Sequence, residues 1–331
     1  MVRVAIDAMG GDFGPAPIVE GTLLALNEKD FIPFLVGNKE IIEPLIPQKY
    51  KKTLEIIDCK DFIKMEEGAS SAIRRKDSSI YVATELAKEG KVDALVSAGH
   101  SGATMSLATL RIGRIEGASR PAICAIMPRQ DGKQSLILDA GANVDCKPEH
   151  LYEFALMGYE YSKNVMGYEN PRIGLLSNGE EESKGNELTK SAFSRLKTLK
   201  GFVGNVEGHN IFDGSTEVIV CDGFVGNIVL KTSEGVAESI TTLIKNFVKV
   251  SLTGVVGALF MKNVFKKLKK RMDYAEYGGA PLLGVNGNVI ICHGKSNAKA
   301  IKNAIFQALT SVDQKINENI IKAFASHPSK E

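Results

Sequence analysis

Short apolar runs alternate along the chain with segments of helical periodicity. The runs with strand character are residues 2–7, 31–36, 54–58, 94–97, 123–127, 136–139, 172–177, 202–206, 218–221 and 289–292. The segments with helical periodicity include residues 16–27, 79–89, 102–113, 148–166, 185–199 and 297–323. Strands that alternate with helices predict an α/β fold, with a doubly wound and mostly parallel sheet sandwiched by helices.

The chain shows no internal repeat, no low-complexity tract and no linker rich in proline or serine. Its 331 residues are 44% hydrophobic and 24% charged, which is enough apolar material for a sizeable core. We therefore expect residues 1–331 to form a single α/β catalytic unit. A long helical stretch at about 228–280 is expected to leave this unit as an excursion.

Charge and cysteine usage exclude several classes of protein. The 41 Lys and Arg residues against 39 Asp and Glu give a net charge of +2, so no nucleic-acid partner is expected. Five scattered cysteines form no C-x-x-C pair and five dispersed histidines show no zinc spacing, so we expect reduced thiols and no metal. Asp7 interrupts the N-terminal apolar run too early for a signal peptide, which predicts a cytoplasmic protein.

Six of the predicted strands lead into glycine-rich polar turns, at residues 7–12, 97–102, 139–143, 178–186, 222–227 and 293–297. Ligands of open α/β sheets bind beyond the carboxyl ends of the strands. Glycine lets backbone N–H groups approach an anion there, and a following helix N-terminus adds positive potential. We expect the six turns to lie on one edge of one sheet and to bind an anion. The chain lacks G-x-G-x-x-G after a strand and lacks a P-loop motif, so an ordinary dinucleotide or P-loop nucleotide site is disfavoured.

These turns resemble those of the PlsX family, the phosphate acyltransferases that act on acyl-carrier-protein thioesters. Matching segments are Ala5-Ile-Asp-Ala-Met-Gly-Gly-Asp12, Asp139-Ala-Gly-Ala-Asn143, Lys184-Gly-Asn186, Cys221-Asp-Gly-Phe-Val-Gly-Asn227 and Ser296-Asn-Ala-Lys-Ala-Ile301. The resemblance covers essentially the whole chain in order. It implies a fold like that of phosphotransacetylases and the isocitrate/isopropylmalate dehydrogenases. It also implies a homodimer without cofactor that makes acyl phosphate from acyl-[acyl-carrier protein] and inorganic phosphate, early in bacterial phospholipid synthesis.

The reaction implied by the resemblance suggests roles for the turn residues. Lys184, Asn227 and His100 are the catalytic candidates, because phosphate and a developing oxyanion need cationic or N–H donors. The candidates for binding substrate are Asp7, Gly10, Gly11, Asp12, Gly99, Ser101, Gly102, Asp139, Asn143, Asn186, Asp222 and Ser296. Each also has a structural interpretation: a capped helix start for His100 and Asn227, a solvated lysine for Lys184, and turn formation for the aspartates.

Residues 257–272 form a basic amphipathic pattern. At 100° per residue, Phe260, Val264, Phe265 and Leu268 share one side and Lys266 and Lys269 lie on the other. Such a helix suits the boundary of an anionic membrane, but it also suits packing on the core or on a second subunit. The resemblance favours peripheral membrane contact, with the acyl phosphate passing to a membrane glycerol-3-phosphate acyltransferase. A basic surface would also suit an acidic acyl carrier protein.

Three other functions stay open on the residues alone. A phosphotransacetylase that uses acyl-CoA has the same fold, and so does an NAD-dependent decarboxylating dehydrogenase. A non-enzymatic interaction protein would account for the basic segment, but it would leave the strand-end turns without a purpose.

Overall fold

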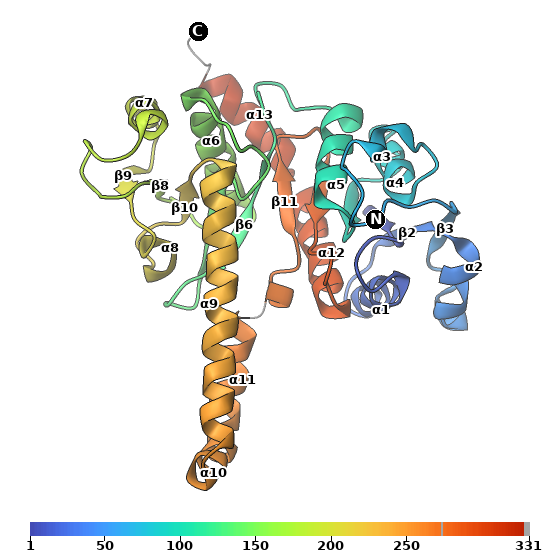
Figure 1. Cartoon of the computed structure of the whole chain (residues 1–331). Helices are drawn as coiled ribbons and strands as arrows, with labels where there is room; N and C mark the ends of the chain where they lie inside the picture. Colours follow the sequence, from blue (N-terminus) through green and yellow to red (C-terminus); the bar gives the residue numbers. More distant parts are fainter. Residues whose placement is uncertain (273, 328–331) are drawn as a thin grey trace.

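The protein, described by a computed structural model for residues 1–272 and 274–327, contains two mostly parallel β-sheets flanked by helices (Figure 1). The side chains of Leu252, Lys269, Met272 and Tyr274 lie outside this description. In spatial order, the larger sheet holds β3 (Glu55–Asp58), β2 (Ile32–Gly37), β1 (Arg3–Asp7), β4 (Ala94–Ser97), β12 (Asn288–Ile291), β11 (Ala280–Leu283) and β5 (Ala122–Ile123). All neighbours are parallel except β11, which is antiparallel to both β12 and β5.

The smaller sheet holds β6 (Ala125–Pro128), β7 (Gln134–Leu138), β10 (Val218–Val220), β8 (Ile173–Leu176) and β9 (Phe202–Val206). Only the β6–β7 pair is antiparallel. The α/β class and the mostly parallel pairing are therefore confirmed, but the expectation of a single sheet is wrong. The apolar run at 123–127 supplies an edge strand to each sheet, with only Cys124 between β5 and β6.

Helices pack against both sheets, and short helical turns connect some of the elements. They are α1 (Pro15–Leu26), α2 (Lys39–Ile42), α3 (Ser71–Arg74), α4 (Ser79–Lys88), α5 (Ser101–Leu107), α6 (Pro148–Asn164), α7 (Glu187–Leu196), α8 (Asn210–Asp213), α12 (Ala298–Asp313) and α13 (Ile316–Ser326), with single turns at Glu43–Leu45, Gln48–Tyr50, Ala108–Ile112 and Tyr274–Glu276. The predicted final helix over 297–323 is in fact two helices. Lys315, whose φ of 50° is left-handed, separates α12 from α13.

The two sheets share a hydrophobic core. Leu138 of β7 and Leu283 of β11 belong to one buried cluster, together with Phe154 of α6 and Phe324 of α13. The strand ends of the two sheets are therefore held at fixed positions by common packing rather than by a flexible linker.

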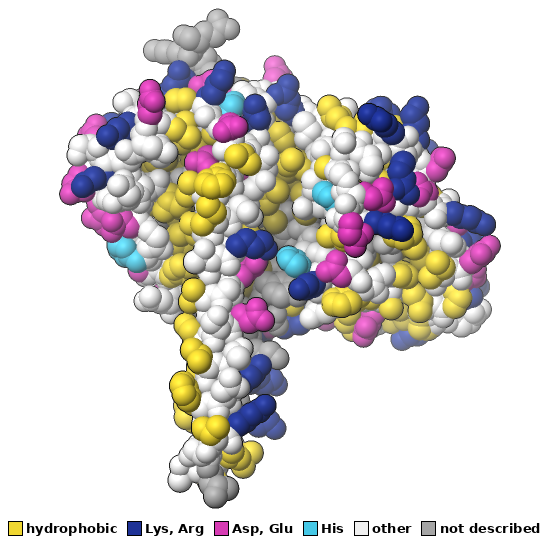
Figure 2. All heavy atoms as spheres, viewed as in Figure 1, with side chains coloured by type: hydrophobic (Ala, Val, Ile, Leu, Met, Phe, Trp, Pro, Cys, Tyr) yellow, Lys and Arg dark blue, Asp and Glu magenta, His cyan; other side chains and the backbone are white. Residues whose placement is uncertain are grey.

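A helical arm extends from the two-sheet body (Figure 1). It consists of α9 (Gly223–Lys249), α10 (Leu252–Phe260) and α11 (Lys262–Met272). At 27 residues, α9 is about 40 Å long. Hydrophobic side chains form a stripe along the arm, and Lys and Arg side chains gather on another side (Figure 2). None of the described helices combines the length and the apolar character needed to span a bilayer.

The segment 257–272 is not one continuous helix as the periodicity predicts. Helix α10 ends at Phe260, and α11 begins at Lys262. The amide of Met261 points to the carbonyl oxygens of both Gly257 and Leu259, which tightens the last turn of α10. Phe260 therefore belongs to a different helix from Val264, Phe265 and Leu268.

Candidate functional site

Three of the glycine-rich turns meet beyond the larger sheet, in what we call the first turn cluster (residues 7–12, 97–102 and 293–296). The hydroxyl of Ser97 donates a hydrogen bond to Oδ2 of Asp7 at 2.9 Å, and the amide of Asp12 donates to the carbonyl of Gly294 at 2.8 Å. The turns after β1 and β4 approach so closely that a Cβ on Gly10 would lie 2.5 Å from the nitrogen of Gly99. Glycine at this position is required by the close approach of two backbones.

Asp7 is buried at the centre of the first turn cluster. Burial raises the pKa of its carboxyl, and hydrogen bonds from Ser97, Ser79 and nearby backbone amides oppose that shift. Ser97 in turn accepts a hydrogen bond from the amide of Gly99 at 3.1 Å. This carboxyl is positioned to orient donors of the turns rather than to face solvent.

His100 begins α5 and caps it. Its Nδ1 accepts a hydrogen bond from the amide of Ala103 at 3.2 Å, so Nε2 is the ring nitrogen left for another partner. Ser101 is exposed beside it, and Gly102 is half-buried. The geometry shows the capping role of His100 directly, and a role in catalysis stays a prediction.

Ser296 completes the first turn cluster from β12. It is 2% exposed, and its hydroxyl has no hydrogen-bond partner among the described residues, although its amide donates to the carbonyl of His293 at 2.9 Å. A buried hydroxyl without a partner is costly in a folded protein, so this one is available to a bound group.

The turns after β7 and β10 form a second turn cluster (residues 139–143 and 222–227), beyond the smaller sheet. At its centre the carboxylate of Asp139 accepts hydrogen bonds from four backbone amides and one side chain: the amides of Ile123, Gly141, Ala142 and Asn143 and Nδ2 of Asn143. Burial raises the pKa of Asp139, and these N–H donors oppose the shift. Asp139 thereby connects β5, the edge strand of the larger sheet, to the turn that follows β7 of the smaller sheet.

The amide side chains of the second turn cluster differ in availability. Asn143 is buried, and its Nδ2 also donates to the carbonyl of Pro121 at 2.7 Å. Asp222 caps α9 by accepting from the amide of Val225 at 2.9 Å, so the expectation that Asn227 might be this cap is wrong. Asn227 is exposed, and a Cβ on Gly141 would lie 3.6 Å from its Oδ1. Asn227 thus faces the Asp139 turn with its amide accessible.

Lys184 lies on a separate loop, between β8 and α7. Its side chain is exposed and packs beside Gly179, and its amide donates to the carbonyl of Glu181 at 2.9 Å. Asn186 caps α7 by accepting from the amide of Thr189 at 2.9 Å. Among the described residues, the ammonium group of Lys184 forms no ion pair, although the Glu181 carboxylate lies near its side chain: a Cβ on Gly179 would be 2.7 Å from Cγ of Lys184 and 2.9 Å from Oε2 of Glu181.

The six turns therefore do not share one sheet edge. The Lys184 loop follows β8, which lies two strands from β7, the strand that leads into Asp139. The first turn cluster follows β1, β4 and β12 of the larger sheet. Hydrogen bonds among the described residues link turns within each cluster and do not join Lys184 to either. Sequence reasoning also missed Ser97, whose only signal was a hydroxyl at the last position of a strand.

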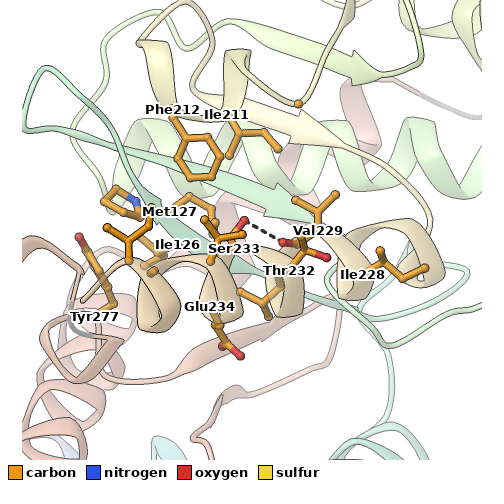
Figure 3. Close-up of a pocket in the computed structure, with 16 residues that line it drawn as sticks. Ile126, Met127, Ile211, Phe212, Ile228, Val229, Thr232, Ser233, Glu234 and Tyr277 are labelled. Carbon is orange, nitrogen blue, oxygen red and sulfur yellow. Dashed lines mark hydrogen bonds between the residues drawn. The ribbon is translucent and has the colours of Figure 1, made fainter. Parts of the chain in front are cut away.

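An apolar pocket of about 680 Å³ adjoins the second turn cluster (Figure 3). Its walls come from β6, from α8 and from α9 as far as Ile240, and Tyr277 also lines it. The lining residues include Ile126, Met127, Phe212, Ile228, Val229 and Ala237. No sequence motif indicates this pocket, because its lining residues come from four segments that are far apart in the chain.

The thiols near the second turn cluster are poor nucleophiles. All five cysteines are free, as expected, and four are buried. Burial, with a contribution from Asp139, raises the pKa of Cys146 to about 12. A thiol that stays protonated at neutral pH does not favour a covalent acyl-cysteine intermediate.

A family model described as "Fatty acid synthesis protein" matches residues 2–319. The chain is 62% identical to a phosphate acyltransferase of Nitratiruptor, over 97% of each chain. It is 58% identical to a phosphate acyltransferase of Helicobacter hepaticus, over 99% of each chain.

Solved structures share the fold at low sequence identity. A phosphotransacetylase from Streptococcus pyogenes aligns with a TM-score of 0.63 at 16% identity, covering 94% of both chains. A putative 4-hydroxythreonine-4-phosphate dehydrogenase from Salmonella typhimurium aligns with a TM-score of 0.52 at 14% identity, covering 94% of this chain and 99% of that one. These similarities establish the architecture and carry no information on substrate.

Proposed function

The chain belongs to the family of fatty acid synthesis proteins, and from that membership we propose that it transfers an acyl group from acyl-[acyl-carrier protein] to inorganic phosphate. The observation that carries the assignment is 62% identity to a phosphate acyltransferase over 97% of both chains. The accessible amide of Asn227 in the second turn cluster, the unpartnered hydroxyl of Ser296 in the first, and the exposed Lys184 on its separate loop support a site for acyl transfer to phosphate.

The proposed reaction exchanges one acyl bond for another. A phosphate oxygen attacks the thioester carbonyl and forms a C–O bond, the C–S bond breaks, and the carrier leaves as a thiolate that takes up a proton. The enzyme must hold a dianion against a carbonyl and stabilise the tetrahedral oxyanion, and both are problems of positioning and electrostatics. Positive or N–H groups that are not already paired within the protein are the ones suited to both tasks.

We assign the catalytic roles on that basis. The exposed ammonium of Lys184 neutralises phosphate or the oxyanion, and the accessible amide of Asn227 donates to the oxyanion, with the substrate lying between the Lys184 loop and the second turn cluster. His100 supplies Nε2, because Nδ1 is occupied as the cap of α5. The buried carboxylates Asp7 and Asp139 orient the turns and do not act as bases.

The principal alternative is a phosphotransacetylase that uses acyl-CoA. Its support is the shared fold at 16% identity, which does not extend to substrate. The same holds for a dehydrogenase on this fold. A competition assay separates the donors: purified enzyme receives phosphate with equal concentrations of hexadecanoyl-carrier protein and hexadecanoyl-CoA. We expect consumption of the carrier thioester, and preferential consumption of the CoA thioester would support the alternative.

We further propose that the protein acts in the cytoplasm at the surface of the membrane, through its arm. Phe260 at the junction of α10 and α11 is 87% exposed, and Val264 and Leu268 of α11 are also exposed. Exposed lysines including Lys266 lie on the same helix, although the Lys269 side chain is outside the described residues. Apolar side chains flanked by cations suit an anionic lipid surface, and the cations also suit an acidic carrier protein. Such a location would deliver acyl phosphate to a membrane glycerol-3-phosphate acyltransferase.

Replacing Phe260 with Glu tests the membrane proposal. The side chain is almost fully exposed, so the fold should survive while insertion into lipid is opposed. We expect Phe260→Glu to lose most of its sedimentation with phosphatidylglycerol-containing vesicles and to keep its acyl transfer in solution. Leu110→Glu, a change at an exposed residue outside the arm, is the matched control. Equal vesicle binding by Phe260→Glu and the unmodified protein would show that the arm does not bind membrane through this residue.

We also propose that the far half of α9 mediates a homodimer. Leu243, Phe247 and Val250 are exposed at spacings of four and three residues, the pattern of a coiled-coil seam. Sedimentation velocity should find a dimer, with Phe247→Glu shifted towards monomer. A monomer at every concentration would contradict the proposal.

A further inference from the structure

The apolar pocket beside α9 has the position and chemistry of a site for a long hydrocarbon chain. We propose that it holds the acyl chain of the substrate during transfer. This inference rests on the proposed acyl transfer, because it assigns a place to the part of the substrate that does not react. Its volume of about 680 Å³ lies within the range of ~300–1,000 Å³ that is usual for ligand pockets.

Two walls of the pocket start at the second turn cluster. One is β6, which begins two residues after Ile123, the residue whose amide donates to Asp139. The second is α9, where the amide of Gly223 donates to the carbonyl of Asn143 at 2.7 Å. Ile228, the first lining residue on α9, directly follows Asn227. A thioester carbonyl held at Asn227 would therefore lie at one end of the pocket, with its chain entering between the walls.

The length of the pocket suits a membrane-lipid chain. On α9 the lining residues run from Ile228 to Ile240, a rise of about 18 Å. One leaflet of a bilayer, which the acyl chains of its lipids fill, is ~15 Å thick. A short acyl group such as acetyl would leave most of the pocket empty.

The lining offers a hydrocarbon almost no competing polar contact. The hydroxyl of Ser233 donates to the carbonyl of Val229 at 2.8 Å within α9 (Figure 3), and Glu234 pairs with Lys231 at 2.9 Å. Ile228, Val236 and Ile240 remain about half exposed along the open side. An exposed apolar surface of this kind marks a binding site. Val236 and Ile240 continue the spacing of the proposed dimer stripe, so a second copy of the chain is the competing occupant, and the binding measurement below separates the two.

Narrowing the pocket gives the first test. We measure kcat/KM for carrier thioesters of 4 to 16 carbons, and we expect it to rise about tenfold for each two carbons until the pocket is filled. Ala237→Phe should lower kcat/KM for the 16-carbon thioester at least tenfold and leave the 4-carbon value unchanged. Ser239→Phe adds the same ring to α9 at a position outside the lining and should keep the original profile. An equal loss at all chain lengths with Ala237→Phe, or no loss at any, would overturn the proposal.

A binding measurement tests the pocket without catalysis. The chain has no tryptophan, so Phe212→Trp places a single reporter in the pocket wall, and Phe247→Trp places one on the far half of α9. Dodecyl phosphate below its micelle concentration should shift the emission of the first variant saturably and leave the second unchanged. If the emission of the Phe212→Trp variant changes with protein concentration but not with added dodecyl phosphate, a second copy of the chain is the occupant and the proposal is rejected. If the enzyme transfers no acyl chain of any length, the proposed reaction fails, and the titration still decides whether the pocket binds a hydrocarbon.

Discussion

At the residue scale, the buried carboxylates of the turns bind donors within the protein, whereas the accessible donors are available to a substrate. Lys184 and Asn227 are exposed, whereas Asp7 and Asp139 are enclosed by N–H and O–H donors. The residue types and their strand-end positions could be predicted from the sequence. Their division into accessible and enclosed groups could not, because it depends on contacts such as Ser97 with Asp7, which join residues 90 positions apart.

Removing either accessible donor should affect turnover and leave the fold intact. We expect Lys184→Ala and Asn227→Ala each to lower kcat about a hundredfold or more, the scale for loss of an oxyanion donor. Lys190→Ala on α7 and Asn246→Ala on α9 are matched controls on exposed helix positions. Steady-state kinetics with circular dichroism as a check on folding would decide the matter, and near-normal turnover would remove that residue from the catalytic set.

Asp7 should give the stability a distinctive pH dependence. Burial raises its folded-state pKa above the ordinary value of 3.8, so the unfolded chain loses this proton first as pH rises. Between pH 3.8 and the folded-state pKa, the Asp7 contribution to unfolding free energy should fall, by at most about 1.4 kcal/mol per pH unit. Urea unfolding from pH 4 to 7 checks this. The free energy of unfolding of the unmodified protein, minus that of Asp7→Asn, should decrease as the pH rises. A constant difference would mean that Asp7 has the same pKa folded and unfolded.

At the scale of elements, helix periodicity located most helices but not their breaks. Lys315 divides the predicted final helix, and Met261 divides the predicted amphipathic segment. Neither position carries the proline or glycine that usually marks a helix end. The helix breaks are set by local backbone geometry and packing, which periodicity alone does not contain.

Two helical glycines should respond in opposite ways to alanine. A Cβ on Gly21 of α1 would lie 2.5 Å from the carbonyl oxygen of Ala298, at the start of α12, so Gly21→Ala should destabilise the protein by about 1–3 kcal/mol. A Cβ on Gly235 of α9 would meet nothing within 4 Å, so Gly235→Ala should stabilise α9 by up to about 1 kcal/mol through helix propensity. Thermal unfolding of both variants measures whether each is less or more stable than the unmodified protein. Destabilisation by both would contradict the open surroundings of Gly235.

At the scale of the whole molecule, the strand–helix alternation predicted the fold class but not the number of sheets. The division follows from β5 and β6, which are consecutive in sequence and pair with β11 and β7 in different sheets. It separates the predicted turns into two clusters and the Lys184 loop, while a core shared between the sheets holds the sheets together. Glycine-rich turns were visible in the sequence because turn chemistry is local. The apolar pocket was not, because it is built from non-local packing.

The central claim is that this molecule uses phosphate as the acceptor of an acyl group from a carrier-protein thioester. The most direct test supplies hexadecanoyl-carrier protein with phosphate carrying ¹⁸O in all four positions, followed by mass spectrometry of the product. The account predicts hexadecanoyl phosphate that retains all four labelled oxygens, because a phosphate oxygen becomes the bridge to the carbonyl carbon. Unlabelled hexadecanoate, with no labelled acyl phosphate, would show hydrolysis instead of transfer and would contradict the account.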